Sequence, residues 1–209
     1  MAITISGSGI TSANIADGTI VNADVADVAA SKLTGALPAI DGSALTGLAS
    51  ANQAQVQTHL ITTSSQLIYA NTVTNITGLN ATITPSTTSK RIKVTARWNG
   101  EWSGATNAHD SVFGLKRDTT IIGNPATSGS RRVGMSIVAM GYAAEEAGST
   151  PDSSFYSYID SPATTSATTY YATFITDEAG TLYNQRTVNN IDGAYAELLT
   201  SNITLEEID

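Results

Sequence analysis

Hydrophobic and polar residues alternate along much of the chain after residue 58, and this alternation is typical of half-buried β-strands. The clearest run is 92–98, where Ile92, Val94, Ala96 and Trp98 alternate with polar residues. Similar runs lie at 66–70, 80–84, 110–117, 134–140, 154–160, 169–176 and 196–208. Segments rich in Gly, Pro, Ser and Asn separate them at 124–130, 147–152 and 161–166. We therefore predict an all-β fold, an antiparallel jelly-roll sandwich of about eight or more strands.

The leading segment has a different pattern, because its branched apolar residues recur every five positions from Ile10 to Val25. A helix turns about 100° per residue and a strand alternates sides, so neither keeps such a row on one face. An extended, bulged chain does keep it, and the strings ANIAD at 13–17 and ADVAD at 23–27 resemble the pentapeptide repeats that build a square β-helix. Roughly twenty residues would make only one coil, which has no second coil to stack on.

An apolar row that its own chain cannot cover needs another copy of the chain. Three extended chains around one axis would each direct these residues inward, and the connector at 35–50 adds further apolar positions between Gly and Pro residues. The alternative is a disordered linker, although such linkers are usually poor in apolar residues. The trimeric shaft interpretation assigns these residues to the axis: Ile10, Ile15, Ile20, Val25, Ile40 and Leu45.

The distribution of aromatic residues divides the chain. The two Trp, eight Tyr and three Phe residues all lie between Tyr69 and Tyr195. The leading third therefore lacks large core side chains. We predict an attachment and shaft segment at 1–50 and a β-sandwich tip at 51–209, with the joint near 47–57.

Composition excludes several classes of function. Only 13% of the 209 residues are charged and the net charge is −8, which is unfavourable for binding nucleic acid. The absence of Cys excludes thiolate zinc sites and cysteine nucleophiles. No apolar run reaches the roughly 18 residues of a membrane span, and the start MAITISGSG does not have the pattern of a secretory signal. We expect no membrane insertion.

Several strings resemble known proteins. ITSANIADGTIVNADVADVAASKL at 10–33 and GALPAIDGSALTGL at 35–48 resemble the shafts and shaft-to-tip joints of tailed-bacteriophage fibres, particularly those of marine and cyanobacterial phages. FGLKRDTTIIG, YSYIDSPATTSATTYYATFIT, GTLYNQR and SNITLEEI resemble the tips of such fibres, whose fold is similar to the trimeric jelly roll of complement C1q and tumour necrosis factor.

The resemblance implies a homotrimeric virion protein that assembles in the host cytoplasm. Its leading segment would bind other virion proteins, and its tip would bind a glycan or protein of the host surface as a tail fibre. The alternative role is a head fibre or a capsid decoration protein bound to the shell. The resemblance implies no set of ligand-binding residues.

The candidates for chemistry are weak, and we expect neither an enzyme nor a cofactor. His59 and His109 lack the neighbouring ligands that a metal site needs. His109, Asp110 and Ser111 are the three residue types of a hydrolase triad. Adjacent residues of a strand face alternate sides, however, so these three side chains cannot converge on one reacting atom. The adjacent pairs Glu145–Glu146 and Glu206–Glu207 diverge for the same reason.

Candidate ligand contacts lie in the run ARWNGEW. Trp98 continues the apolar alternation and is expected in the core. The ring of Trp102 could stack on a sugar, and Asn99 and Glu101 beside it could form hydrogen bonds with that sugar. The pattern fits equally well with Trp102 in the core or in a trimer interface. The basic pairs at 90–91, 116–117 and 131–132 would form an anion-binding patch only if they converge.

Overall fold

The computed structural model of this chain describes residues 16, 55–103, 110–137, 139–140, 148–194 and 196–209. The chain divides into two units, Met1–Ala49 and Ser50–Asp209. The six predicted shaft residues, Ile10, Ile15, Ile20, Val25, Ile40 and Leu45, lie outside the described residues. Every strand of the described part belongs to the second unit.

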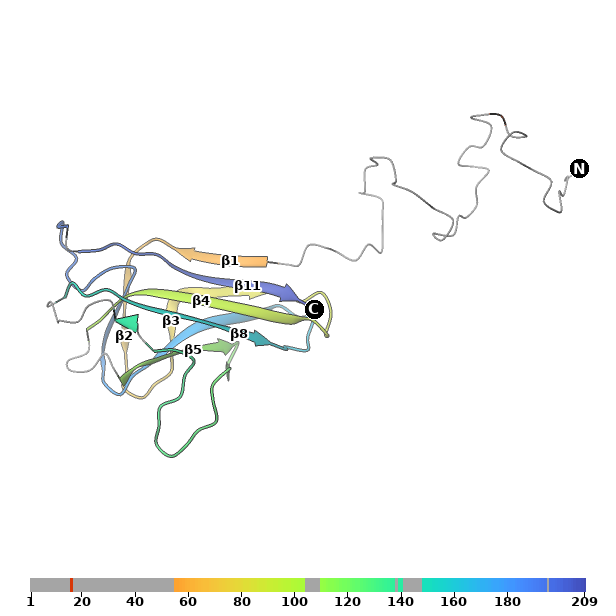
Figure 1. Ribbon diagram of the computed structural model, residues 1–209, viewed down its shortest axis with the longest axis horizontal. Helices are drawn as coiled ribbons and strands as arrows, with labels where there is room; N and C mark the ends of the chain where they lie inside the picture. The colour runs from red at the N-terminus through yellow and green to blue at the C-terminus, as the bar shows by residue number, and fades with distance from the viewer. Residues whose placement is uncertain (1–15, 17–54, 104–109, 138, 141–147, 195) are drawn as a thin grey trace, which may run out of the picture. The chain divides into compact units, whose positions relative to one another are not determined.

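The second unit is a sandwich of two antiparallel sheets (Figure 1). The larger sheet contains β1 (Gln55–Leu60), β2 (Ser64–Ile68), β4 (Arg91–Trp102), β7 (Ala139–Met140), β8 (Asp152–Asp160), β10 (Gly180–Asn184) and β11 (Ser201–Ile208). The smaller sheet contains β3 (Thr74–Ile83), β5 (Val112–Arg117), β6 (Thr120–Ile122) and β9 (Thr168–Ile175). No α-helix occurs in the described part of the chain. The predicted all-β class is confirmed.

The strand pairs are nested along the chain. β5 pairs with β6, β4 with β8, β3 with β9 and β1 with β11, so each pair encloses the one before it. The pairs β5–β6 and β3–β9 belong to the smaller sheet, whereas β4–β8, β1–β11 and the further nested pair β2–β10 belong to the larger one. A long hairpin rolled up in this way is a jelly roll.

The core lies between the sheets. Ile92, Val94, Ala96 and Trp98 of β4 are all fully buried, as their alternation predicts. The ring centroid of Phe113 lies 5.0 Å from the ring centroid of Trp98 and 4.9 Å from that of Phe174. This aromatic contact joins strands of both sheets and fixes how they stack.

Several boundaries differ from the sequence-based prediction. Strands β1, β6 and β10 were not predicted, and β1 begins inside the predicted joint at 47–57. The described residues of the run 134–140 form the short β7 and a bridge between Ser136 and Phe113, while 196–208 becomes strand only from Ser201. The short strands carry too few alternating residues to give a local pattern, so pairing with neighbours decides them.

The sandwich has two distinct ends. Gln55 at the start of β1 pairs with Glu206, so the chain enters the body beside its last strand, and we call this end the base (Figure 1). The turn between β3 and β4 also lies at the base. The opposite loop end carries residues 69–73, the start of β5 and the end of β9.

Candidate functional site

The predicted ligand contacts Asn99, Glu101 and Trp102 all lie at the loop-end half of β4. Alternation places Asn99 and Glu101 on the outer side of the sheet and Trp102 on the core side. All three are nevertheless buried, with exposed fractions of 8%, 4% and 6%. A surface-ligand contact would need these side chains to be exposed, and the structure instead buries them under other parts of the chain.

Asn99 closes the gap where β10 ends and β11 begins along the same edge of β4. Its backbone N–H donates to Ser201 Oγ at 2.9 Å and its carbonyl accepts from the Gln185 N–H at 2.9 Å. Its side-chain amide donates to the Thr200 carbonyl. Asn99 therefore holds both ends of the segment 185–200, which is a structural role.

Glu101 joins two further segments through one buried carboxylate. It accepts hydrogen bonds from Thr150 Oγ1 at 3.0 Å and from the Val188 N–H at 2.7 Å. Asp152 lies next to it on β8, where it pairs with Gly100. Burial, with a smaller contribution from the Glu101 charge, raises the pKa of Asp152 to about 7.

Trp102 packs into the core with its ring 5.2 Å from that of Phe174. Of the positions that the sequence left open for Trp102, the structure shows the core position. The segments near residues 150 and 188 that cover Glu101 are far from the run ARWNGEW in sequence. The periodicity of this run therefore could not predict that Asn99 and Glu101 are buried.

The three basic pairs do not converge. Lys90 and Arg91 bind Asp209 at the base. Arg117 forms an ion pair with Asp160 at 2.8 Å, and Asp160 also accepts a hydrogen bond from the Tyr170 hydroxyl. At the loop end, the Arg132 guanidinium donates to Asn71 Oδ1 at 2.7 Å and to the Asp110 carbonyl at 2.6 Å. Each pair serves a separate contact, so the anion-binding patch is not formed.

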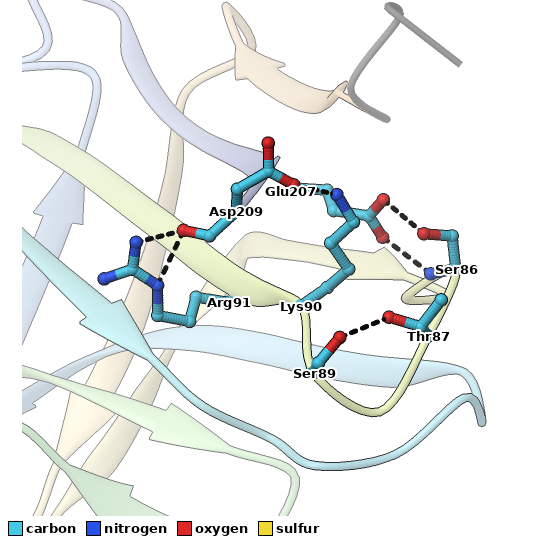
Figure 2. Close-up of polar contacts among 7 residues, drawn as sticks. All are labelled: Ser86, Thr87, Ser89, Lys90, Arg91, Glu207 and Asp209. Atoms are coloured by element: carbon cyan, nitrogen blue, oxygen red, sulfur yellow. Dashed lines mark hydrogen bonds and ion pairs between the residues drawn. The ribbon is translucent and has the colours of Figure 1, made fainter. Parts of the chain in front are cut away.

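The last strand is clamped at the base by polar contacts (Figure 2). The Glu207 carboxylate, only 5% exposed, accepts bonds from both the backbone N–H and the hydroxyl of Ser86. Lys90 forms an ion pair with the Asp209 side chain, and the Arg91 guanidinium donates to the Asp209 main-chain oxygen. We call these five residues the base clamp. It ties the β3–β4 turn to β11, beside the entry of the chain into the body.

Large apolar side chains are exposed at two opposite edges of the larger sheet. Gly100 pairs with Asp152 of β8 and with Asn184 of β10, so β8 and β10 flank opposite edges of β4. Phe155 and Ile159 form the β8 patch, and Phe155 is 63% exposed. On the other side β2 follows β10, and around it lie three exposed residues that form the β2 patch: Ile61, Leu67 and Tyr69.

The remaining candidates form no catalytic arrangement that the described residues reveal. His59 is exposed on β1, and His109 of the adjacent triplet lies outside the described residues. Within the described ranges no group of three or more His, Asp or Glu side chains could hold a metal ion. The same ranges contain no helix long and apolar enough to cross a membrane.

Comparison of the sequence with protein-family models and with curated proteins gave no match.

Proposed function

We propose that the chain is a homotrimeric fibre protein of a virion, with residues 1–50 as its attachment and shaft segment and the jelly roll as its tip. Its role is adhesion to a host-surface glycan or protein, without catalysis. The observation that carries the proposal is the pair of exposed apolar patches at opposite edges of one sheet.

Two different patches on one subunit favour a head-to-tail contact, in which one patch meets the other patch of the next copy. Such contacts close into a ring when the rotation between copies is a simple fraction of a turn, and a ring of three matches the trimeric jelly rolls that the tip strings resemble. Phe155 and Leu67 are 63% and 65% exposed in the single chain. Apolar side chains gathered at an edge in this way are typical of interaction sites.

The two ends of the body fit a fibre tip. Strand β1, which follows the leading segment in sequence, begins at the base beside the clamped last strand, so in this proposal the opposite loop end faces the host surface. Three weak sites on one rigid particle would bind a repetitive surface much more strongly than one site.

The test is the molar mass of the full chain by light scattering at micromolar concentration. We expect three times the chain mass of 21.6 kDa, and a monomer would overturn the trimer. Phe155→Lys and Leu67→Lys should each shift the mass toward the monomer. Ile191→Lys, which changes an exposed apolar residue outside both patches, is the matched control and should leave the mass unchanged.

Adhesion is tested separately with the purified trimer. Binding to host cells and competition with infection support the tail-fibre role. A trimer that does neither, and that immunogold labelling places on the capsid, favours the head-fibre or decoration role instead.

A further inference from the structure

One row of side chains crosses all four strands of the smaller sheet on its outer face. The strand register places Tyr171 of β9 between Asn80 of β3 and Lys116 of β5. Lys116 in turn lies opposite Ile121 of β6. Tyr170, directly before Tyr171, is fully buried, so alternation directs Tyr171 and the residues opposite it away from the core. We call these four residues the outer row: Asn80, Tyr171, Lys116 and Ile121.

The Tyr171 ring has short side chains beside it along its own strand. Thr169 and Thr173, two residues before and after it, lie on the same side of β9. Gly114, which pairs with Thr173, has no side chain at all. Tyr171 and Lys116 therefore carry the longest side chains of this part of the face, and both remain partly exposed.

The polar groups of the outer row are not used by the fold. Within the described part of the chain, no hydrogen bond, ion pair or ring contact involves the side chain of Asn80, Tyr171 or Lys116. In the next row toward the base, by contrast, the hydroxyls of Thr82 and Thr169 bond to each other at 2.8 Å. Asn80 and Lys116 lie two strand spacings apart, roughly 10 Å, with Tyr171 between them. Polar groups that can bind a ligand thus flank an aromatic ring on both sides.

We infer that the outer row binds a neutral pyranose of glucose configuration. All ring hydroxyls of such a sugar are equatorial, so its C–H face can stack on the Tyr171 ring without burying a hydroxyl. The hydroxyls at its two sides then meet Asn80, whose amide donates and accepts, and Lys116, whose ammonium group donates. An open-chain polyol offers the same hydroxyls but no flat apolar face.

The charges around the outer row favour a neutral sugar over an acidic one. Lys116 would attract a carboxylate, but the exposed Asp118 follows it by two residues and accepts a hydrogen bond from the Thr169 N–H at 3.0 Å. The chain as a whole carries a net charge of −8. An acidic sugar would therefore gain from Lys116 and lose to Asp118 and to the field of the whole protein.

This glycan site rests on the proposed function, in which the tip adheres to a host surface. The outer row lies on the smaller sheet, whereas both apolar patches lie on the larger one. The head-to-tail contact proposed above therefore does not use it, and a trimer would present three copies on its flanks. Three weak sites of this kind suit a repetitive glycan surface.

The test is saturation-transfer NMR on the full chain, titrated with methyl β-glucoside, methyl β-glucuronide and glucitol. We expect the glucoside to bind with a dissociation constant on the order of 1–10 mM, the glucuronide no more tightly, and glucitol at least about fivefold more weakly. Tyr171→Val should weaken glucoside binding at least about fivefold, whereas Tyr171→Phe should keep it. Lys116→Met and Asn80→Ala should each weaken it about two- to tenfold.

Arg131→Gln is the control for charge, because it removes an exposed cation outside the outer row and should leave glucoside binding unchanged. Thermal unfolding of each variant establishes that it is folded. If Tyr171→Val does not fold, the losses in Lys116→Met and Asn80→Ala decide.

The inference is overturned if the glucoside does not bind, if glucitol binds as tightly, or if none of the outer-row variants weakens binding. Tighter binding of the glucuronide would overturn the assignment to a neutral sugar. If the glucoside fails while the trimer still adheres to host cells, only this inference fails. If the glucoside binds as expected but the trimer does not adhere, the proposed function fails instead.

Discussion

Glu207 accepts two hydrogen bonds from Ser86, one from its backbone N–H and one from its hydroxyl, each 2.6 Å long (Figure 2). The two residues are far apart in the chain and belong to the last strand and to the turn between β3, in the smaller sheet, and β4, in the larger one. This contact therefore fastens the last strand to the connection between the two sheets. It also fixes the strand that pairs with β1, where the leading segment enters the body.

We predict that Glu207→Gln destabilises the body by about 1–3 kcal/mol, because the amide nitrogen cannot accept the bond that one carboxylate oxygen accepts. Urea unfolding of the variant at pH 7 measures the loss. Thr87→Ala, on the exposed part of the same turn, is the control and should change the free energy of unfolding by less than about 0.5 kcal/mol. An equal loss in both variants would contradict the prediction.

The Glu207 contact also predicts a pH dependence. The Ser86 hydroxyl, with smaller contributions from the Ser86 N–H and Lys90, lowers the pKa of Glu207 in the folded state. The resulting stability is present above the ordinary Glu pKa of about 4.3 and is lost as pH falls through the lowered value. The difference in unfolding free energy between wild type and Glu207→Gln should therefore shrink between pH 5 and pH 3.

Asp152 gives the opposite dependence. Its pKa is raised to about 7, first by burial and then by the Glu101 charge. The folded state then favours the protonated form, so this group's contribution to stability is complete below the ordinary Asp pKa of about 3.9 and is lost as pH rises to 7.

We predict that Asp152→Asn becomes more stable relative to wild type as pH is raised from 4 to 8, by on the order of 1–2 kcal/mol after solvent screening. Chemical unfolding at both pH values measures this. Asp192→Asn, at an exposed position, is the control. A relative stability of Asp152→Asn that does not change with pH would show that Asp152 titrates as an ordinary carboxyl.

Glu101→Ala should act on stability and not on adhesion. The change leaves the Thr150 hydroxyl and the Val188 N–H without their acceptor, at a cost of about 1–3 kcal/mol. Thermal unfolding measures the loss, and cell binding is measured well below the unfolding temperature. Lost adhesion in a folded variant of unchanged stability would restore Glu101 as a ligand contact.

Gly100→Ala should be among the most damaging small substitutions in the body. An added methyl group would lie 2.0 Å from the Tyr183 carbonyl oxygen and 2.8 Å from the Trp98 ring, so β4 and β10 would have to separate. We expect a loss of about 3 kcal/mol or more, measured by urea unfolding. Gly129→Ala is the comparison, because nothing lies within 4 Å of its methyl group and only its φ of 63° is unfavourable, at a cost of about 1–2 kcal/mol.

The sequence predicted part of the core correctly, but it did not predict how the candidate site is covered. The inward face of β4 was predictable because alternation at 92–98 repeats often enough to identify the buried side. In the structure Asn99 and Glu101 lie on the outer side of the sheet and are nevertheless buried, so they are not exposed as a ligand contact would require. Burial of an outward residue depends on segments that cross over it, and alternation carries no information about them.

Local sequence patterns were enough to define the all-β fold class and the buried face of β4, since both follow from the alternation of apolar and polar residues. The nested pairing, the base clamp, the cover over Asn99 and Glu101, and the separation of the three basic pairs became apparent only in three dimensions. These features depend on contacts between residues far apart in the chain, such as Ser86 with Glu207 and Glu101 with Val188. Such contacts form because the rolled hairpin brings distant segments to the same end of the sandwich, and local spacing does not determine which segments meet there.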